Sequence, residues 1–115
     1  MPEKNIFQKI IDKEVPAKIV YEDERVLAFR DVNPKAPTHI LVVPKKALAR
    51  ISEAAAGDEP LLGHLLTVAV GIARQVGIGE SGYRLVINNG PHAGESVPHL
   101  HVHLLGGRPM AWPPG

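Results

Sequence analysis

The sequence predicts an α+β fold, in which one mainly antiparallel sheet of about five strands is covered on one face by a long helix. Short apolar segments bounded by Pro, Gly, Asn and Asp indicate the strands. One longer segment, residues 59–76, carries apolar residues at helical spacing, and a shorter one lies near the N-terminus. Helices lie before and between strands joined by short connections, which is typical of the α+β class.

Composition limits the kind of protein this is. The 115 residues suit a single domain spanning residues 1–115, with 44% hydrophobic and 22% charged residues. A net charge of +1 gives no electrostatic reason to expect nucleic acid or a membrane as a partner. The absence of cysteine excludes disulfides and cysteine-ligated zinc. No secretory signal or membrane-spanning stretch is visible, so a cytoplasmic location is expected.

The first half of the chain predicts a short helix and then three strands. Apolar residues spaced four apart favour a helix over residues 3–11. Residues 31–38 contain two prolines and are expected to form a loop, because proline interrupts regular structure. The three expected strands are residues 17–21, 25–30 and 39–43.

The second half predicts the main helix and two further strands. Asp58 is the expected N-cap of the helix over residues 59–76, and Gly77 is its expected C-terminal cap. His64 within this helix is interpreted as structural or exposed, and a helical turn is expected within residues 46–55. The strands are residues 83–89 and 97–105. A glycine-bearing loop, residues 90–96, joins them and predicts an antiparallel hairpin.

Three histidines alternate with apolar residues in the last expected strand. Side chains of a strand point alternately to its two faces, so His99, His101 and His103 share one face and the apolar residues face the core. Neighbouring Cα atoms in this row lie roughly 6.6 Å apart, so all three rings cannot reach one zinc with bonds of about 2 Å. The spacing favours His101 as a nucleophile or general base held by its neighbours. One histidine binding a metal, or a polar face formed by chance, stays an alternative.

The residues around this strand suggest a phosphate and ribose site. Gly94, Glu95 and Ser96 are expected to offer unpaired backbone N–H groups to an anion, and the Ser96 hydroxyl adds another donor. Asn88 lies at the end of the neighbouring strand, where its amide can reach the same phosphate. Asp31 can accept two ribose hydroxyls. In isolation, ordinary turn formation explains Asn88 equally well, and it explains Asp31 and the glycine-bearing loop better.

An apolar slot for a nucleotide base is a further expectation, although core packing alone would explain the same residues. No phosphate-binding P-loop, dinucleotide fingerprint or serine-centred triad is present. The expected slot consists of Ile6, Phe7, Ile10, Phe29 and Val32.

Residues 99–105 resemble the motif of the histidine triad (HIT) superfamily, in which three histidines alternate with apolar residues. The remaining chain resembles the Hint branch, the histidine triad nucleotide-binding proteins. Pro98 stands where an aromatic residue is more common in that branch. The matching stretches are residues 6–11, 14–19, 36–39, 44–46, 61–65, 82–84, 106–110 and 112–115.

The resemblance implies a HIT-like fold and hydrolysis of the P–N bond in a purine nucleoside phosphoramidate, without a metal or other cofactor. His101 would attack phosphorus and form a nucleotidyl-histidine that water then hydrolyses. The implied catalytic residues are His39, Ser96, His99, His101 and His103. The implied nucleotide-binding residues are Phe7, Ile10, Phe29, Asp31, Val32, Asn88, Gly94, Glu95, Ser96 and Val97.

The resemblance also implies a homodimer in which the sheet continues into the partner. The tail, residues 108–115, contains three prolines and the only tryptophan, Trp112. Aromatic residues are enriched at interfaces, so the tail is expected at the dimer interface, although packing on its own domain is an alternative.

Two other functions stay open at this point. A dinucleoside polyphosphate hydrolase or nucleotidyl transferase of the same superfamily would keep the fold and change the substrate. A nucleotide- or zinc-binding interaction protein would have no turnover as its output.

Overall fold

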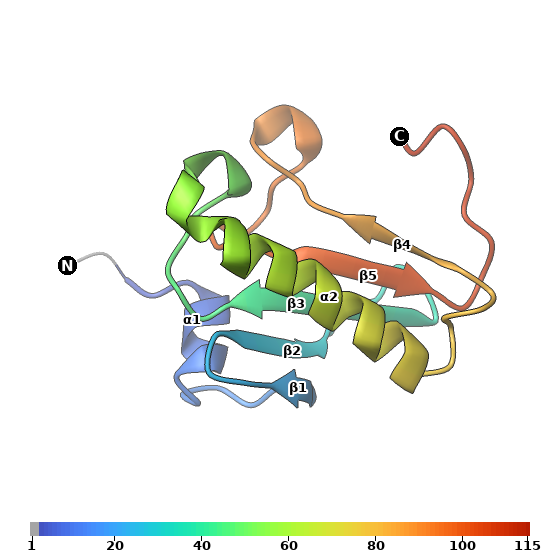
Figure 1. The fold of residues 1–115 in the computed structure, drawn as a ribbon, viewed down its shortest axis with the longest axis horizontal. Coiled ribbons are helices and arrows are strands. Elements are labelled where there is room, and N and C mark those ends of the chain that lie inside the picture. The colour runs from blue at the N-terminus through green and yellow to red at the C-terminus, as the bar shows by residue number, and fades with distance from the viewer. Residues whose placement is uncertain (1–2) are drawn as a thin grey trace.

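A computed structural model describes residues 3–115 and contains one five-stranded sheet in the order β1-β2-β3-β5-β4, with every neighbouring pair antiparallel (Figure 1). The predicted α+β class and antiparallel sheet are therefore confirmed. The strands are β1 (Ile19–Glu22), β2 (Val26–Arg30), β3 (Thr38–Pro44), β4 (Tyr83–Val86) and β5 (Val102–Gly106). The helices are α1 (Ile6–Ile11) and α2 (Glu59–Gln75), with 3₁₀ turns η1 (Ile51–Glu53), η2 (Ala56–Asp58) and η3 (Pro91–Ala93).

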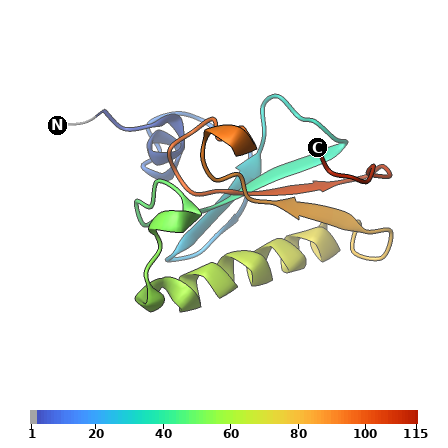
Figure 2. The ribbon, with the colours of Figure 1, turned by 90° about the horizontal axis from the view of Figure 1, so that it is seen from above.

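The two faces of the sheet carry different helices. Figure 2 shows α2 running along one face, while α1 lies on the opposite side. The side chains of β3 point alternately to the two faces of the sheet. Ile40 and Val42 pack in the core on the α2 side, and Leu41 and Val43 pack in the core on the α1 side. Among residues 3–115, no helix combines the length and the apolar content that crossing a membrane requires.

The first helix begins later than predicted. It starts at Ile6 because the Asn5 side chain accepts the Gln8 N–H at 2.8 Å and so caps the helix. Residues 3–5 precede this cap and are not helical.

The main helix ends as predicted and begins with a different cap. Gly77 has φ 85°, and the N–H groups of residues 77 and 78 donate to Arg74 and Ala73 in a Schellman arrangement. Asp58 occupies the N-cap position without bonding the helix. Its carboxylate accepts instead from the Ala55 N–H and from Lys46 Nζ, so the capping prediction was right in position and wrong in bonding.

The histidine of α2 has a structural role, as interpreted from the sequence. His64 Nε2 lies 2.6 Å from the Asp23 carboxylate, which also accepts the Tyr21 hydroxyl at 2.7 Å. The other Asp23 oxygen accepts two backbone N–H groups of the turn between β1 and β2. This cluster joins α2 to the first hairpin.

The fifth strand is shorter than predicted, but its alternation holds. The ladder with β3 begins at Val102 and not at residue 97, and β4 ends at Val86 and not at residue 89. The carbonyl of Pro44 accepts from the His99 ring, and the Leu100 N–H donates to Leu48, so side-chain and loop bonds replace the ladder here. The apolar residues Leu100, Val102 and Leu104 all belong to the α2 core.

Two glycines end the fifth strand where the loop between β2 and β3 passes close to it. Gly107 has φ 90°, and a methyl group at this position would lie 2.9 Å from Cβ of Pro37. Only glycine combines this backbone conformation with so close an approach.

Replacing Gly107 by alanine is expected to lower the free energy of unfolding by about 1–3 kcal/mol, because it adds backbone strain and a steric clash. Urea denaturation measures this change. Gly57→Ala is the matched control, since no atom lies within 4 Å of a methyl group there and φ is not positive. Equal stability of the two variants would contradict this account of the glycine pair.

Candidate active site

A cavity of about 560 Å³ opens on the α1 side of the sheet, where β3, β5 and the loop after β4 meet. Segments far apart in sequence contribute to its wall, from α1 to the last strand. The predicted site residues that line it are Phe7, Asp31, His39, Asn88, Gly94, Ser96, Val97 and His103.

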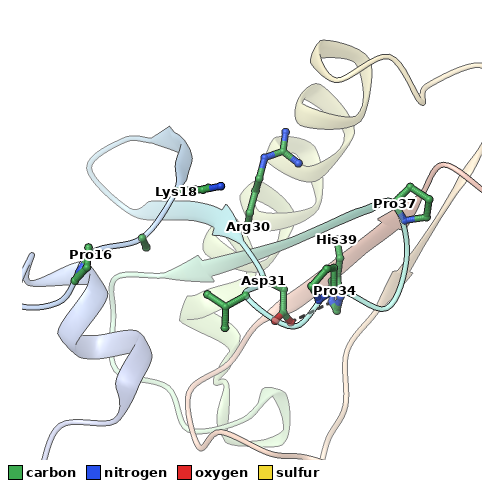
Figure 3. A pocket seen from close by; sticks show the side chains of 9 residues that line it. Pro16, Lys18, Arg30, Asp31, Pro34, Pro37 and His39 are labelled. Carbon is green, nitrogen blue, oxygen red and sulfur yellow. Dashed lines mark ion pairs between the residues drawn. The ribbon is translucent and has the colours of Figure 1, made fainter.

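A second cavity of about 640 Å³ adjoins the first, because Asp31 and His39 line both. Figure 3 shows it with Lys18 and Arg30 at one side and the Asp31–His39 ion pair at the other. Val32 lines this second cavity and is 97% exposed. Asp31 therefore lies at the junction of two adjoining hollows.

The proton of the His101 ring is fixed by the backbone. His101 Nδ1 lies 2.7 Å from the carbonyl oxygen of His99, and a carbonyl can only accept, so Nδ1 carries the hydrogen. In the neutral ring the lone pair is then on Nε2. Among residues 3–115, no group bonds Nε2, and this nitrogen is not sealed from solvent.

The His101 ring lies between two residues of the cavity wall. Its centroid is 5.0 Å from that of Phe7 and 4.9 Å from that of His103, and both of these residues line the cavity. His101 itself is only 5% exposed. The ring thus lies behind Phe7 and His103, is not itself a lining residue of either cavity, and has an Nε2 that bonds no other described group.

A second set of bonds fixes the protons of His39 and His103. The Lys35 backbone N–H donates to His39 Nδ1 at 3.0 Å, so His39 carries its hydrogen on Nε2. That nitrogen lies 2.9 Å from His103 Nδ1 and 3.4 Å from an Asp31 oxygen. His39 therefore donates to His103, and neutral His103 carries its own hydrogen on Nε2.

Burial keeps these histidines neutral near pH 7. Burial lowers the pKa of His103 to about 4, with further lowering from the charges on His101 and His39. Burial also lowers the pKa of His39, although Asp31 opposes this shift. His103 is consequently a neutral hydrogen-bond donor and not a cation at physiological pH.

His99 supports the site from behind its neighbour. Its ring is 1% exposed, donates from Nε2 to the Pro44 carbonyl at 2.8 Å, and has a pKa lowered by burial. The sequence predicted that its ring would flank His101 in the strand. The described contact with His101 instead comes from the His99 carbonyl.

The loop over residues 90–96 is more closed than predicted. The N–H of Gly94 donates to Pro91 and that of Glu95 to Gly90, at 3.1 and 3.2 Å, so the expectation that both are unpaired was wrong. The 3₁₀ turn η3 uses these groups internally. The Glu95 carboxylate also turns to Arg50 and the Gly90 N–H.

Two residues of the expected base slot lie in the core. Ile10 and Phe29 are 8% and 3% exposed, pack in the α1 cluster, and line neither cavity. Phe7 contacts Phe29 edge to face and does line the first cavity. Core packing thus accounts for Ile10 and Phe29, and neither residue forms part of a cavity wall.

The ligand atoms of Asp31, His39 and His103 lie within 4.8 Å of one another, which is close enough to consider a metal. A metal-bound histidine normally donates from its other ring nitrogen. Here the Lys35 N–H donates to His39 Nδ1. If Nε2 bound a metal, Nδ1 of the neutral ring would have to carry a hydrogen, which would then point at the hydrogen of the Lys35 N–H. The group fits a hydrogen-bond relay better than a metal site.

Comparison with known proteins identifies the family. The HIT domain model matches residues 12–110. The chain belongs to the HIT family. This HIT chain is 51% identical over 110 residues to the purine nucleoside phosphoramidase of Escherichia coli, covering 96% of this chain and 92% of that protein. It is also 58% identical over 112 residues to a 14 kDa zinc-binding protein of Zea mays, covering 96% and 87% respectively.

A solved HIT structure gives the same fold. The HIT family hydrolase from Legionella pneumophila superimposes with a TM-score of 0.95 at 48% identity, covering 97% of this chain and 100% of that one. The resemblance read from the histidine motif is confirmed at the level of the family.

Sequence reasoning missed two contributors to the HIT site. Lys35 acts through its backbone N–H, which no side-chain pattern reveals. Arg50 binds Glu95 across 45 positions, and a lone arginine between two turns gives no signal of that pairing. Only the fold brings these partners together.

Acid is expected to destabilise the protein between about pH 6.5 and pH 4. His103 has a folded pKa near 4 against an unfolded value of 6.5, so the unfolded chain binds more protons in this window and stability falls as pH falls. The loss from His103 alone is on the order of 2 kcal/mol. Urea denaturation at pH 7, 6, 5 and 4 measures it.

The variant His103→Asn removes this contribution, and its stability should decline less steeply over the same pH range. His92→Asn, an exposed residue of η3, is the control and should retain the parental slope. Equal slopes for the parent and His103→Asn would show that His103 is not held neutral by the fold.

Proposed function

We propose that this HIT protein hydrolyses the P–N bond of purine nucleoside phosphoramidates through a nucleotidyl-histidine on His101. The observation that carries the proposal is the bond from His101 Nδ1–H to the His99 carbonyl, which leaves the Nε2 lone pair free. The 51% identity to the Escherichia coli purine nucleoside phosphoramidase supports the reaction type.

The residues around the cavity support one placement of the substrate. The α-phosphate would lie between His103, Ser96 and Asn88, which line the cavity together. The ribose hydroxyls would meet Asp31 at the junction of the two hollows. The base would then lie toward Phe7 and Val32.

In the first step the His101 Nε2 lone pair attacks the α-phosphorus. The P–N bond to the amine breaks, its electron pair stays on the amine nitrogen, and that nitrogen gains a proton. Ser96 or His103 is placed to relay this proton. In the second step water attacks phosphorus and gives a proton back to the residue that relayed one to the amine, the Nε2–P bond breaks, and its electron pair returns to His101 Nε2 as the monophosphate leaves.

Neutral partners suit this reaction. Phosphoryl transfer needs positioning and charge stabilisation more than covalent assistance. His103 offers an Nε2–H to a phosphoryl oxygen, and the His39 and Lys35 bonds fix that hydrogen in place. No residue other than His101 needs to change its covalent state.

Replacing His101 by asparagine or alanine should lower kcat by at least about 10³-fold, because the covalent route is lost. Nucleotide binding should persist. Turnover of adenosine 5′-phosphoramidate and calorimetric binding of AMP measure the two effects. His92→Asn is again the control, and a His101 variant with parental kcat would sink the assignment.

A superfamily alternative changes the substrate while keeping the nucleophile. A dinucleoside polyphosphate hydrolase or nucleotidyl transferase would also use His101. We expect kcat/KM to be higher for an adenosine phosphoramidate than for a diadenosine polyphosphate. The reverse order would replace the proposed substrate class and leave the His101 chemistry intact.

Zinc binding is the second candidate function, favoured by the name of the Zea mays relative and by the Asp31–His39–His103 group. Because the Lys35 N–H donates to His39, we expect substoichiometric zinc in protein purified without added metal. Elemental analysis measures it. One tightly held zinc per chain, lost in His39→Gln, would favour the binding function.

We also propose that a single HIT domain, residues 1–115, forms a homodimer through β4 and the tail. The strand β4 is an edge of the sheet, and such edges are normally covered. Trp112 is 81% exposed, with the Arg84 guanidinium 5.9 Å from its ring centroid. Arg84 also donates to the Ala111 carbonyl and so holds the tail beside β4.

Trp112→Ala should weaken the dimer by at least about tenfold in Kd, because interface tryptophans contribute strongly to binding. Analytical ultracentrifugation across a dilution series measures the change. Val32→Ala, an exposed apolar residue remote from β4, is the control. Unchanged dissociation in Trp112→Ala would place the tail outside the interface.

A further inference from the structure

The loop that carries the phosphate-binding candidates is held by one neighbouring segment, residues 48–53. Three bonds join the two: the Leu100 N–H donates to Leu48, Arg50 donates to Glu95, and the Ser52 N–H donates to the Asn89 side chain. These contacts run along the loop in antiparallel order. Residues 48–53 therefore hold residues 89–100 in position.

The central contact is a two-pronged ion pair. Arg50 Nε and Nη2 donate to the two Glu95 oxygens at 2.9 and 3.0 Å, and the Gly90 N–H donates to one of the same oxygens at 3.0 Å. The Glu95 side chain is 13% exposed, and Arg50 lowers its pKa to about 2. Such paired bonds fix geometry as well as charge.

Glu95 lies between two residues of the cavity wall without lining the cavity itself. Gly94 and Ser96 face the cavity, and the Glu95 carboxylate turns away to Arg50. A displacement of Glu95 must therefore move both neighbours relative to His101. Small displacements matter, since about 1 Å of misplacement can cost roughly 10²-fold in rate.

The same carboxylate acts on the catalytic ring electrostatically, since a charge on His101 lowers the Glu95 pKa. His99 and His103 from its own segment and His39 from β3 also interact with this ring, and burial lowers the pKa of all three. From α1 the uncharged Phe7 ring packs against it. Asp31 is a further anion of this histidine cluster, 3.4 Å from His39 Nε2, and Arg50 also pairs with Glu53, so an uncompensated Glu95 would add to the negative charge that acts on His101.

We propose that Arg50 is a positioning residue of the reaction: it holds Gly94 and Ser96 against the α-phosphate through Glu95 and cancels the Glu95 charge beside His101. This inference rests on the proposed function for its kinetic consequences. The effects of Arg50 on the position of Gly94 and Ser96 and on the charge near His101 can be measured without turnover.

Three variants separate geometry from charge. Arg50→Gln breaks the ion pair and leaves the Glu95 charge uncompensated. Arg50→Lys keeps the positive charge but loses the two parallel hydrogen bonds. The double variant Arg50→Gln with Glu95→Gln removes both charges. All three should lower kcat about 10- to 50-fold with KM changed less than about threefold, because the phosphate contacts are misplaced. Lys13→Gln breaks an exposed pair with Glu22 and is the control.

The pH dependence distinguishes the variants from one another. In Arg50→Gln the free carboxylate favours the protonated His101 ring, so its pKa should rise by about 0.5–1 unit and the acid limb of kcat/KM should move upward. In Arg50→Lys and in the double variant the His101 pKa should stay near the parental value. A general loss of folding would not produce this difference.

The His101 titration, followed by NMR of the ¹⁵N-labelled ring without substrate, decides the proposal independently of activity. A parental His101 pKa in Arg50→Gln, together with kcat within twofold of the parent, would overturn it. So would a kcat loss that matches in all three variants a fall in melting temperature and disappears on cooling. If the parent fails to cleave phosphoramidates, the proposed function fails, whereas the titration and AMP-induced shifts of the Gly94 and Ser96 amides still test Arg50.

Discussion

Two backbone groups decide which nitrogen of each histidine in the candidate site carries a hydrogen. The His99 carbonyl accepts from His101 and leaves its outer nitrogen basic, while the Lys35 N–H donates to His39 and sets the direction of the His39–His103 bond. Backbone groups cannot exchange these roles, so the tautomers do not depend on solvent. The proposed catalysis through a neutral imidazole depends on this constraint.

The two faces of the sheet have different roles. Its α2 face buries Leu100, Val102 and Leu104, and this burial holds the last strand in register between β3 and β4. The opposite face is then free to carry histidines at the pleat spacing. The same segment thus stabilises the domain with one set of side chains and presents the candidate site histidines with the other.

Much of this arrangement was predictable from the sequence, because it depends on local periodicity. The alternation of residues 99–104 set the faces, and Gly77 set the end of the main helix through its left-handed backbone conformation. The interruption of the strand before Val102 was not predictable, since it depends on bonds to Pro44 and Leu48 from distant segments. The burial of Phe29 and the pairing of Glu95 with Arg50 likewise follow from long-range packing.

The position of β5 in the sheet has a consequence for how the protein is made. The last strand in the chain lies in the interior of the sheet, between β3 and β4, and it carries His103. During synthesis the edges of β3 and β4 that pair with β5 therefore stay unpaired until β5 has emerged. Non-local pairing of this kind forms slowly. The nascent chain has neither a complete sheet nor a complete candidate site until its final residues emerge, so the fold and the site are completed together.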